Sequence, residues 1–219
     1  MHKPPGIHVH PTSLSLGEVS LQEIIMEVAG RKPFPVHRLD RPTSGVLLFT
    51  WDAPAAGVLG KLFQTRRVEK SYQALVRGWC PGFCSFKDLE DLDNGGNFQS
   101  ARTEVVPKLW YEIPQPLGRY ETTRISLVDL FPHTGRRHQL RRHLKSAFHP
   151  IIGDTRYSDG KYNDFFRGLW NQHRLFLLSR SLRFPHPVSG EILEVTTDWE
   201  PEVLELWKSI EFNLVVKDF

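Results

Sequence analysis

The order of strand and helix patterns is the feature that most limits the fold of this 219-residue chain. Alternating or apolar runs predict strands at 45–50, 70–78, 103–110, 122–131, 175–178 and 192–195. Apolar residues at helical spacing predict helices at 21–29, 54–64, 137–146 and 201–209. The two kinds of element do not alternate regularly, and several strands adjoin tight turns. We therefore expect an α+β fold with a mainly antiparallel mixed sheet flanked by helices and loops, not a doubly wound parallel sheet.

Local signals refine some of these elements. Gly30 is expected to end the first helix, and Asp52 to cap the second, with Pro54 in its first turn. The inner face of that second helix is predicted to carry Val58, Leu59, Leu62 and Phe63. The opening stretch to Gly17 is expected to be irregular with a short strand, and 81–99 to be a loop or hairpin excursion.

The composition is that of a globular protein, with 40% hydrophobic residues and a net charge of only +3. The length suits one domain, which we place at 1–219. The distribution of charge is more informative than its total, because the segment 136–145 has no acidic residue. Its cationic side chains are Arg136, Arg137, Arg141, Arg142 and Lys145. Such a cluster favours a partner bound through phosphates, above all RNA.

Several classes of site and location are disfavoured. Cys80 and Cys84 are too few for a disulfide framework or a zinc site, so two free thiols and a reducing compartment are expected. His8 and His10 share one strand face without companion ligands, and we expect no metal. A membrane span of about 20 apolar residues and a signal peptide are both lacking, which indicates a soluble cytoplasmic protein.

The segment His37-Arg-Leu-Asp-Arg-Pro-Thr-Ser-Gly45 carries the most chemistry. A carboxylate, Asp40, stands between Arg38 and Arg41, and a Pro-Thr-Ser-Gly turn then leads into the apolar run 45–49. A turn at the end of a core element is a common place for a functional group. From the residues alone, a surface loop with local charge neutralisation explains the segment equally well.

This segment resembles the catalytic motif of pseudouridine synthases of the RluA type, which is His-Arg-Leu-Asp followed by Thr-Ser-Gly. Three other stretches resemble that family in order and spacing, so the resemblance extends from Lys3 to about Val195. They are Lys3-Pro-Pro-Gly6, Glu69-Lys-Ser-Tyr-Gln-Ala-Leu-Val-Arg-Gly78, and Gly135-Arg-Arg-His-Gln-Leu-Arg141 with His149-Pro-Ile-Ile-Gly-Asp154. The resemblance implies a pseudouridine synthase catalytic domain that isomerises uridine in RNA without a cofactor.

The resemblance also implies a role for each candidate site residue. Asp40 is the catalytic aspartate, Arg141 pairs with its carboxylate, and Tyr72 stacks on the base. A paired uridine must be flipped, and Arg38 is the candidate to fill the vacated stack. The other expected substrate-binding residues are His37, Arg41, His138 and Gln139, and the phosphate-binding ones are Arg136, Arg137, Arg142 and Lys145. Without the motif, Tyr72 would be an ordinary strand aromatic and 138–145 a solvated helix face.

Other activities fit less well or remain open. Glycoside hydrolysis usually needs two carboxylates, whereas the motif offers one acid among arginines. A non-catalytic RNA-binding or folding protein would gain nothing from Asp40, which repels phosphate. Within the family, Gly118-Arg-Tyr-Glu-Thr-Thr-Arg124 and 134–143 resemble the subgroup that acts on uridine 65 of tRNA, and a ribosomal-RNA enzyme is the alternative.

The remaining expectations concern departures from the family and partners. The N-terminal strand is expected to be shorter than in relatives, and Ser158 stands where a glycine is expected. No separate RNA-binding domain is expected, so the catalytic domain itself must select the target. The expected partner is RNA, most of all tRNA, with no membrane, no obligate protein partner and a monomeric state.

Overall fold

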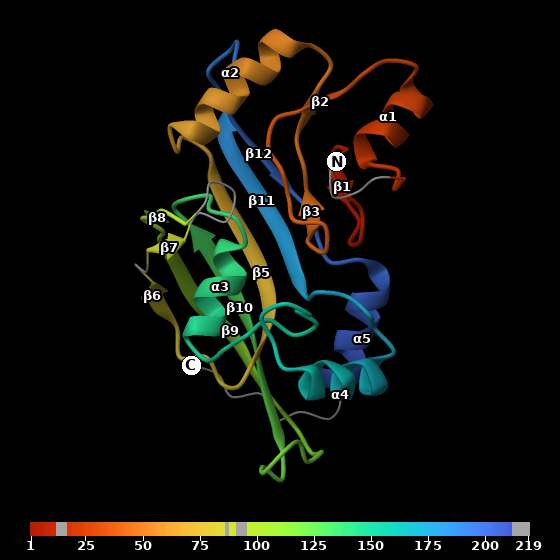
Figure 1. Cartoon of the computed structure of the whole chain (residues 1–219), viewed down its shortest axis with the longest axis vertical. Helices are drawn as coiled ribbons and strands as arrows, with labels where there is room; N and C mark the ends of the chain where they lie inside the picture. Colours follow the sequence, from red (N-terminus) through yellow and green to blue (C-terminus); the bar gives the residue numbers. More distant parts are fainter. Residues whose placement is uncertain (12–16, 86–87, 91–95, 212–219) are drawn as a thin grey trace. The chain divides into compact units, whose positions relative to one another are not determined.

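The computed structural model describes residues 1–11, 17–85, 88–90 and 96–211, and the chain forms two compact units. The first unit comprises residues 1–70 and 179–198, and the second comprises residues 71–178 and the chain from 199 onward. The chain thus leaves the first unit, builds most of the second, and returns to the first before its last helix (Figure 1).

The first unit contains two helices and several short strands (Figure 1). Its elements are β1 (His2–Lys3), α1 (Leu21–Ala29), β2 (Phe34–Pro35), β3 (Ser44–Val46), β4 (Phe49–Thr50), α2 (Ala53–Gln64), most of β11 (Leu177–Pro185) and β12 (Ile192–Thr196). Strand β3 lies between β1 and β11, and β12 pairs with β11. The core between these elements is apolar and includes Val46, Leu59, Leu62, Leu182 and Phe184.

The second unit is built on four antiparallel strands in the order β5-β10-β9-β6. Its elements are β5 (Glu69–Arg77), β6 (Phe83–Ser85), β7 (Leu89–Glu90), β8 (Phe98–Gln99), β9 (Thr103–Ile113), β10 (Thr123–Pro132), α3 (Gln139–Ser146), α4 (Gly160–Trp170) and α5 (Pro201–Glu211). One core cluster is rich in aromatic side chains from α4 and around Phe176 and Trp199, and a second lies beneath α3. The expected α+β class with antiparallel pairing is confirmed.

Local sequence signals account for the helix ends that were predicted. Ser20 and Glu23 form a reciprocal capping box at the start of α1, and Gly30 ends that helix in the left-handed region at φ +66°. The Asp52 side chain accepts a hydrogen bond of 2.8 Å from the Ala55 backbone N–H, which caps α2.

Other predictions about the elements are corrected. The run 45–50 is two strands, because the chain exchanges its partner: Val46 pairs with His2 in β1, whereas Phe49 pairs with Pro35 in β2. Val58 is 48% exposed and does not lie on the inner face of α2. The short strand expected in the opening stretch is present as β1.

Helix α4 was not predicted from the sequence. It contains two glycines, which weaken helix propensity, and its buried side chains include Phe166 and Trp170. Trp170 packs on Phe176, which in turn packs on Trp199, and this cluster stabilises the helix through contacts that cannot be seen in a local pattern.

The structure also bears on the cysteines and on the lengths of the helices. Cys80 is buried and Cys84 exposed, and both are free thiols, as predicted. Within the described ranges, no helix is long and apolar enough to cross a bilayer.

Candidate functional site

The loop that carries Asp40 is fixed by contacts on both sides of the carboxylate. Leu39 is buried with 6% of its surface exposed, whereas Arg38 is exposed and Asp40 half-buried. The Thr43 backbone N–H donates to the Asp40 carbonyl oxygen at 3.0 Å, which closes a tight turn directly after the carboxylate. Burial of Leu39 and the closed turn after Asp40 therefore anchor the loop, while the Asp40 side chain remains partly accessible.

The segment from Lys3 to Gly6 supports this loop from beneath. Lys3 is fully buried, and its ammonium group donates to the carbonyl oxygens of Pro4, Ile7 and Arg41 at 2.8, 2.9 and 3.0 Å. The backbone N–H of Gly6 donates to the same Arg41 carbonyl at 2.9 Å. Three acceptors satisfy the three donors of the ammonium group, so a buried charge is tolerated here. The Lys-Pro-Pro-Gly segment thus positions the residue next to Asp40.

Arg41 itself is bound to the N-terminal segment. Its Nε donates to the Gly6 carbonyl at 2.9 Å, and its guanidinium lies 3.1 Å from the Glu18 carboxylate. This ion pair is half exposed, and pairs of that kind contribute little to stability. These contacts hold the Arg41 guanidinium against Gly6 and Glu18. The expected role of Arg41 in substrate binding stays a prediction.

His37 makes structural contacts at the start of the motif. Its Nε2 accepts a hydrogen bond of 3.1 Å from the Leu48 backbone N–H, and its ring stacks on Phe63 with centroids 4.6 Å apart. Burial, followed by the charge of Lys70, lowers the pKa of the imidazole to about 3. A neutral ring is required, because only an unprotonated Nε2 can accept the Leu48 hydrogen bond. The substrate-binding role predicted for His37 is untested.

Gly45 allows the chain after the motif to run close to β11. Its φ of +115° is strained for residues with a side chain, and a Cβ at this position would collide with the backbone of Ser179. The Thr-Ser-Gly turn therefore ends in the residue that this close approach requires.

In the second unit, the candidate residues lie on β5 and at the start of α3. Tyr72 is half-buried in β5, opposite Leu130 of β10, and its ring packs on the core cluster beneath α3. The predicted helix at 137–146 begins two residues later, at Gln139, because His138 has a left-handed backbone with φ +54°. Its Nδ1 lies 2.9 Å from the Tyr157 hydroxyl. This unusual backbone turns His138 away from the regular helix and toward Tyr157.

Gln139 is buried and belongs to a hydrogen-bond network that joins the turn before α3 to β9. Its Oε1 accepts from the Thr134 hydroxyl at 2.6 Å and from the Arg136 backbone N–H at 3.0 Å. Its Nε2 donates to the Arg102 carbonyl and the Thr103 hydroxyl, both at 2.9 Å. Both ends of the amide are thus engaged within the protein, which gives Gln139 a structural task alongside the substrate contact predicted for it.

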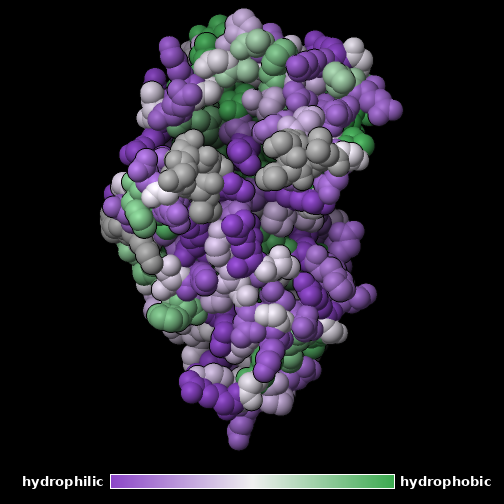
Figure 2. Space-filling view, viewed as in Figure 1, coloured by the Kyte–Doolittle hydropathy of each residue, from purple (hydrophilic) through white to green (hydrophobic). Residues whose placement is uncertain are grey.

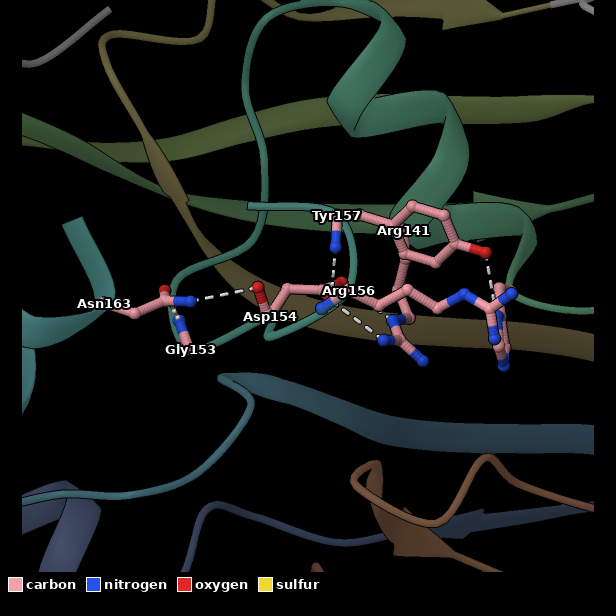
Figure 3. Close-up of polar contacts among 7 residues, drawn as sticks. Arg141, Gly153, Asp154, Arg156, Tyr157 and Asn163 are labelled. Carbon is pink, nitrogen blue, oxygen red and sulfur yellow. Dashed lines mark hydrogen bonds and ion pairs between the residues drawn. The ribbon is translucent and has the colours of Figure 1, made fainter. Parts of the chain in front are cut away.

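Arg141 forms a buried bidentate ion pair with Asp154 (Figure 3). Its Nε and a terminal nitrogen donate to the two carboxylate oxygens at 2.7 and 2.8 Å, and the two side chains are 6% and 0% exposed. Burial alone would raise the pKa of Asp154, but hydrogen bonds from Arg141 and its charge outweigh burial and lower that pKa. Such a pair fixes the plane of the guanidinium.

Further contacts hold Asp154 in turn, as Figure 3 shows. Its Oδ1 accepts the backbone N–H groups of Arg156 and Tyr157 at 2.9 and 3.0 Å, and its carbonyl accepts from the Asn163 amide at 3.0 Å. The sequence analysis noted the block ending in Asp154 but assigned no role to Asp154, Tyr157 or Asn163. The pairing of Arg141 with Asp40, which the resemblance implies, stays a prediction.

The remaining basic candidates border α3. Arg142 and Lys145 are on the helix, where Lys145 is exposed, and Arg136 and Arg137 precede it. Arg142 donates to the Glu90 carbonyl at 2.8 Å, and Arg136 to the Ser100 carbonyl at 3.2 Å. Because Arg141 is buried, the accessible part of the expected basic cluster consists of these four residues. In the part of the chain that the structure describes, no group of three or more metal-ligating side chains occurs.

Comparison with known proteins places this arrangement in a family. The sequence model described as RNA pseudouridylate synthase matches residues 1–146. A tRNA pseudouridine synthase C from Vibrio parahaemolyticus is 36% identical over 97% of this chain and 91% of its own length. The enzyme of the same name from Haemophilus influenzae is 38% identical, over 96% and 91%.

A solved structure shares the fold. Human RNA pseudouridylate synthase domain containing 4 superposes with a TM-score of 0.70 at 24% identity, covering 99% of this chain and 89% of the human one. At this identity the likeness concerns the fold, which agrees with the α+β architecture described above.

Proposed function

Because the chain belongs to the RNA pseudouridylate synthase family, we propose that it converts uridine to pseudouridine in tRNA, with Asp40 as the catalytic residue. The observation that carries this proposal is the anchored motif loop, in which a half-buried carboxylate follows a buried leucine and precedes a closed turn. The relatives named tRNA pseudouridine synthase C support the choice of tRNA as the substrate.

The reaction is an isomerisation, so its atoms balance without a cofactor. The bond from uracil N1 to ribose C1′ breaks, the base turns, and a bond from C5 to C1′ forms, while C5 loses a proton and N1 gains one. Asp40 would act on the sugar, either as a nucleophile, as a base, or by stabilising positive charge on the ring. Each of these tasks needs an ionised carboxylate at a fixed position.

The other candidate residues would hold the substrate. Tyr72 offers a flat ring for stacking on the base, and its packing on the core keeps that ring in place. Arg141 has its guanidinium plane fixed by Asp154, which suits a residue that must orient an anionic group. Arg38 is exposed, as a residue inserted between bases would need to be.

At the finer level, we propose uridine 65 of tRNA as the target, on the likeness of 118–124 and 134–143 to that subgroup. On this proposal the enzyme acts in the cytoplasm as a monomer with RNA as its partner. Lys145, which is exposed, and the partly exposed Arg136, Arg137 and Arg142 would bind phosphates.

The test is incubation of the purified protein with an unmodified tRNA transcript, followed by chemical modification and primer extension to map pseudouridine. The Asp40→Asn variant and a ribosomal-RNA fragment are run in parallel. We expect a stop at uridine 65 that the variant abolishes while its unfolding curve stays close to that of the wild type. Modification of the ribosomal fragment alone would contradict the tRNA proposal, and binding of both RNAs without modification would contradict catalysis.

A further inference from the structure

A polar pocket lies in the second unit, at the turn that joins β9 to β10. It encloses about 280 Å³, close to the lower end of known ligand pockets at roughly 300 Å³. Its walls come from three segments, namely Arg77 at the end of β5, the turn at 117–120, and 159–162 at the start of α4. None of these residues belongs to the site described above.

The turn is built so that two side chains stand at its tip. Leu117 and Tyr120 form an isolated antiparallel bridge around Gly118 and Arg119, and Gly118 has φ +68°, as tight hairpin turns require. The Arg119 guanidinium donates to the Tyr120 hydroxyl at 2.9 Å. Tyr120 is 52% exposed, so its ring is accessible to a base.

The opposite wall repeats the combination of a cation and an aromatic ring. The Arg77 guanidinium lies 3.5 Å from the centre of the Tyr162 ring. The main chain of Arg77 is held at both ends, because its N–H donates to the Pro150 carbonyl and its carbonyl contacts the His149 ring. The guanidinium itself is positioned by its contact with the Tyr162 ring.

Charge in the pocket favours an anion. Arg77, Arg119 and Lys161 contribute three positive charges, and Asp159 contributes one negative charge. The Asp159 carboxylate accepts the Lys161 backbone N–H at 2.9 Å as the cap of α4, so part of its hydrogen-bonding capacity serves the helix. In Figure 2 the end of this unit that holds the turn is mainly hydrophilic.

The pocket and Tyr72 lie at different positions along the same strands. Tyr72 pairs with Leu130, whereas Arg77 pairs with Ile125 near the hairpin turn. At about 3.4 Å per residue, five residues separate the two positions by roughly 17 Å along β5. An RNA that places one nucleotide at Tyr72 could therefore place a different nucleotide at the pocket.

From the two cation–aromatic walls and the excess of positive charge, we propose that this pocket binds one unpaired nucleotide of the RNA substrate, away from the reacting uridine. A flat base stacks on the exposed Tyr120 ring, and the phosphate is held by Arg119, Arg77 and Lys161. The inference rests on the proposed function, since it takes the RNA substrate from there. It gives the catalytic domain a second contact by which to select its target.

The test measures binding of the unmodified tRNA transcript by filter retention, with the Arg119→Ala and Tyr120→Ala variants. Both side chains are exposed, so the variants should fold like the wild type. Arg167→Ala is the matched control, because it removes the same charge from the last turn of α4, outside the pocket. We expect the dissociation constant to rise about tenfold in each pocket variant and less than twofold in the control.

A rise in KM with an unchanged kcat would accompany this loss of binding, because the pocket does not touch the reacting base. Equal binding by wild type and both pocket variants, or an equal loss in Arg167→Ala, would overturn the proposal. Saturable binding of free uridine monophosphate at micromolar concentration, lost in Tyr120→Ala, would overturn it in favour of a mononucleotide site.

The same experiment separates this inference from the proposed function. If the wild type modifies the ribosomal fragment and not tRNA, the target assignment fails, and the variants are then compared on the fragment. If the pocket variants bind the ribosomal fragment more weakly than the wild type does, the pocket proposal is still supported. If they bind it equally well, the pocket proposal is overturned.

Discussion

At the scale of single residues, burial separates side chains that the sequence presents as alike. Arg141 and Arg142 are neighbours in one basic run, yet Arg141 is buried against Asp154 whereas Arg142 lies at the surface and contacts the Glu90 carbonyl. Only the first has a guanidinium fixed by two hydrogen bonds to a buried carboxylate. The carboxylate that provides this geometry is 13 residues away in sequence, in a segment without regular structure.

Removal of the Asp154 charge should destabilise the protein strongly. In Asp154→Asn the buried Arg141 guanidinium loses its counter-charge, and we expect the free energy of unfolding to fall by about 3–5 kcal/mol. Urea denaturation measures this change. The matched control is Asp164→Asn, which breaks an exposed pair with Arg167 and should cost less than about 1 kcal/mol. Similar losses of unfolding free energy in the two variants would show that the buried pair stabilises the protein no more than the exposed one.

His37 should make stability depend on pH. Its folded pKa of about 3 is below its ordinary value of 6.5, so the unfolded chain takes up a proton that the folded chain does not. The contribution to stability is therefore present above pH 6.5 and is lost as the pH falls toward 3, by up to about 1.4 kcal/mol per pH unit.

The matched variant for this effect is His37→Gln, whose amide oxygen can still accept the Leu48 hydrogen bond but does not titrate. The free energy of unfolding is measured between pH 7.5 and 4.5 for both proteins. We expect the advantage of the wild type over the variant to shrink as the pH falls. A constant difference across this range would show that His37 titrates normally.

At the scale of elements, two tight turns depend on glycines, because a side chain at either position would collide with neighbouring backbone. Gly45 ends the motif and lets β3 approach Ser179, and Gly153 precedes Asp154 where a Cβ would collide with the Arg174 carbonyl. Gly45 ends the motif that carries Asp40, and Gly153 adjoins Asp154, so the close packing at both places depends on the absence of a side chain.

Substitution of Gly45 by alanine should therefore destabilise the first unit. The strained φ of +115° and the collision with Ser179 lead us to expect a loss of at least about 2 kcal/mol in the free energy of unfolding. Gly57→Ala is the control, because Gly57 lies in α2 with nothing near its missing Cβ. That change should raise stability by about 0.5–1 kcal/mol. Thermal unfolding of the two variants measures these changes. A Gly45→Ala variant as stable as the wild type would disprove the close approach of Gly45 to Ser179.

At the scale of the whole molecule, the small net charge of +3 means that affinity for RNA must come from local clusters. The partly or fully exposed cations beside α3 form one such cluster, and the pocket at the β9–β10 turn forms another within the same unit. Each phosphate contact releases counterions, so the salt dependence of binding reports how many cations take part.

Lys145→Ala should reduce that salt dependence. Lys145 is exposed on α3, and if it contacts one phosphate, the slope of log Kd against log salt concentration should fall by about 1. Lys208→Ala removes the same charge from α5, where Lys208 is paired with Glu205, and should leave the slope unchanged. The measurement is a titration of tRNA binding at several salt concentrations. An unchanged slope in Lys145→Ala would remove Lys145 from the proposed RNA contacts.

The sequence by itself determined the family, the α+β class and the position of the Asp40 loop. The reason is that motif residues, helix caps and alternating strands are local features, each set by neighbours a few positions away. The capping box at Ser20 and the Asp52 cap are examples in which side chain and backbone partner are three residues apart. For the same reason, the strands β5, β9 and β10 were predicted within three residues of their observed ends.

Only the tertiary structure decided which polar residues are buried and with which partners. Gln139 and His143 contact Thr103 across about 40 residues of chain, Arg141 contacts Asp154, and α4 is stabilised by aromatic rings from distant segments. Burial is a property of these long-range contacts, and no local pattern contains it. The division into two units and the pocket at the hairpin turn arise in the same way, since each combines segments that are far apart in the sequence.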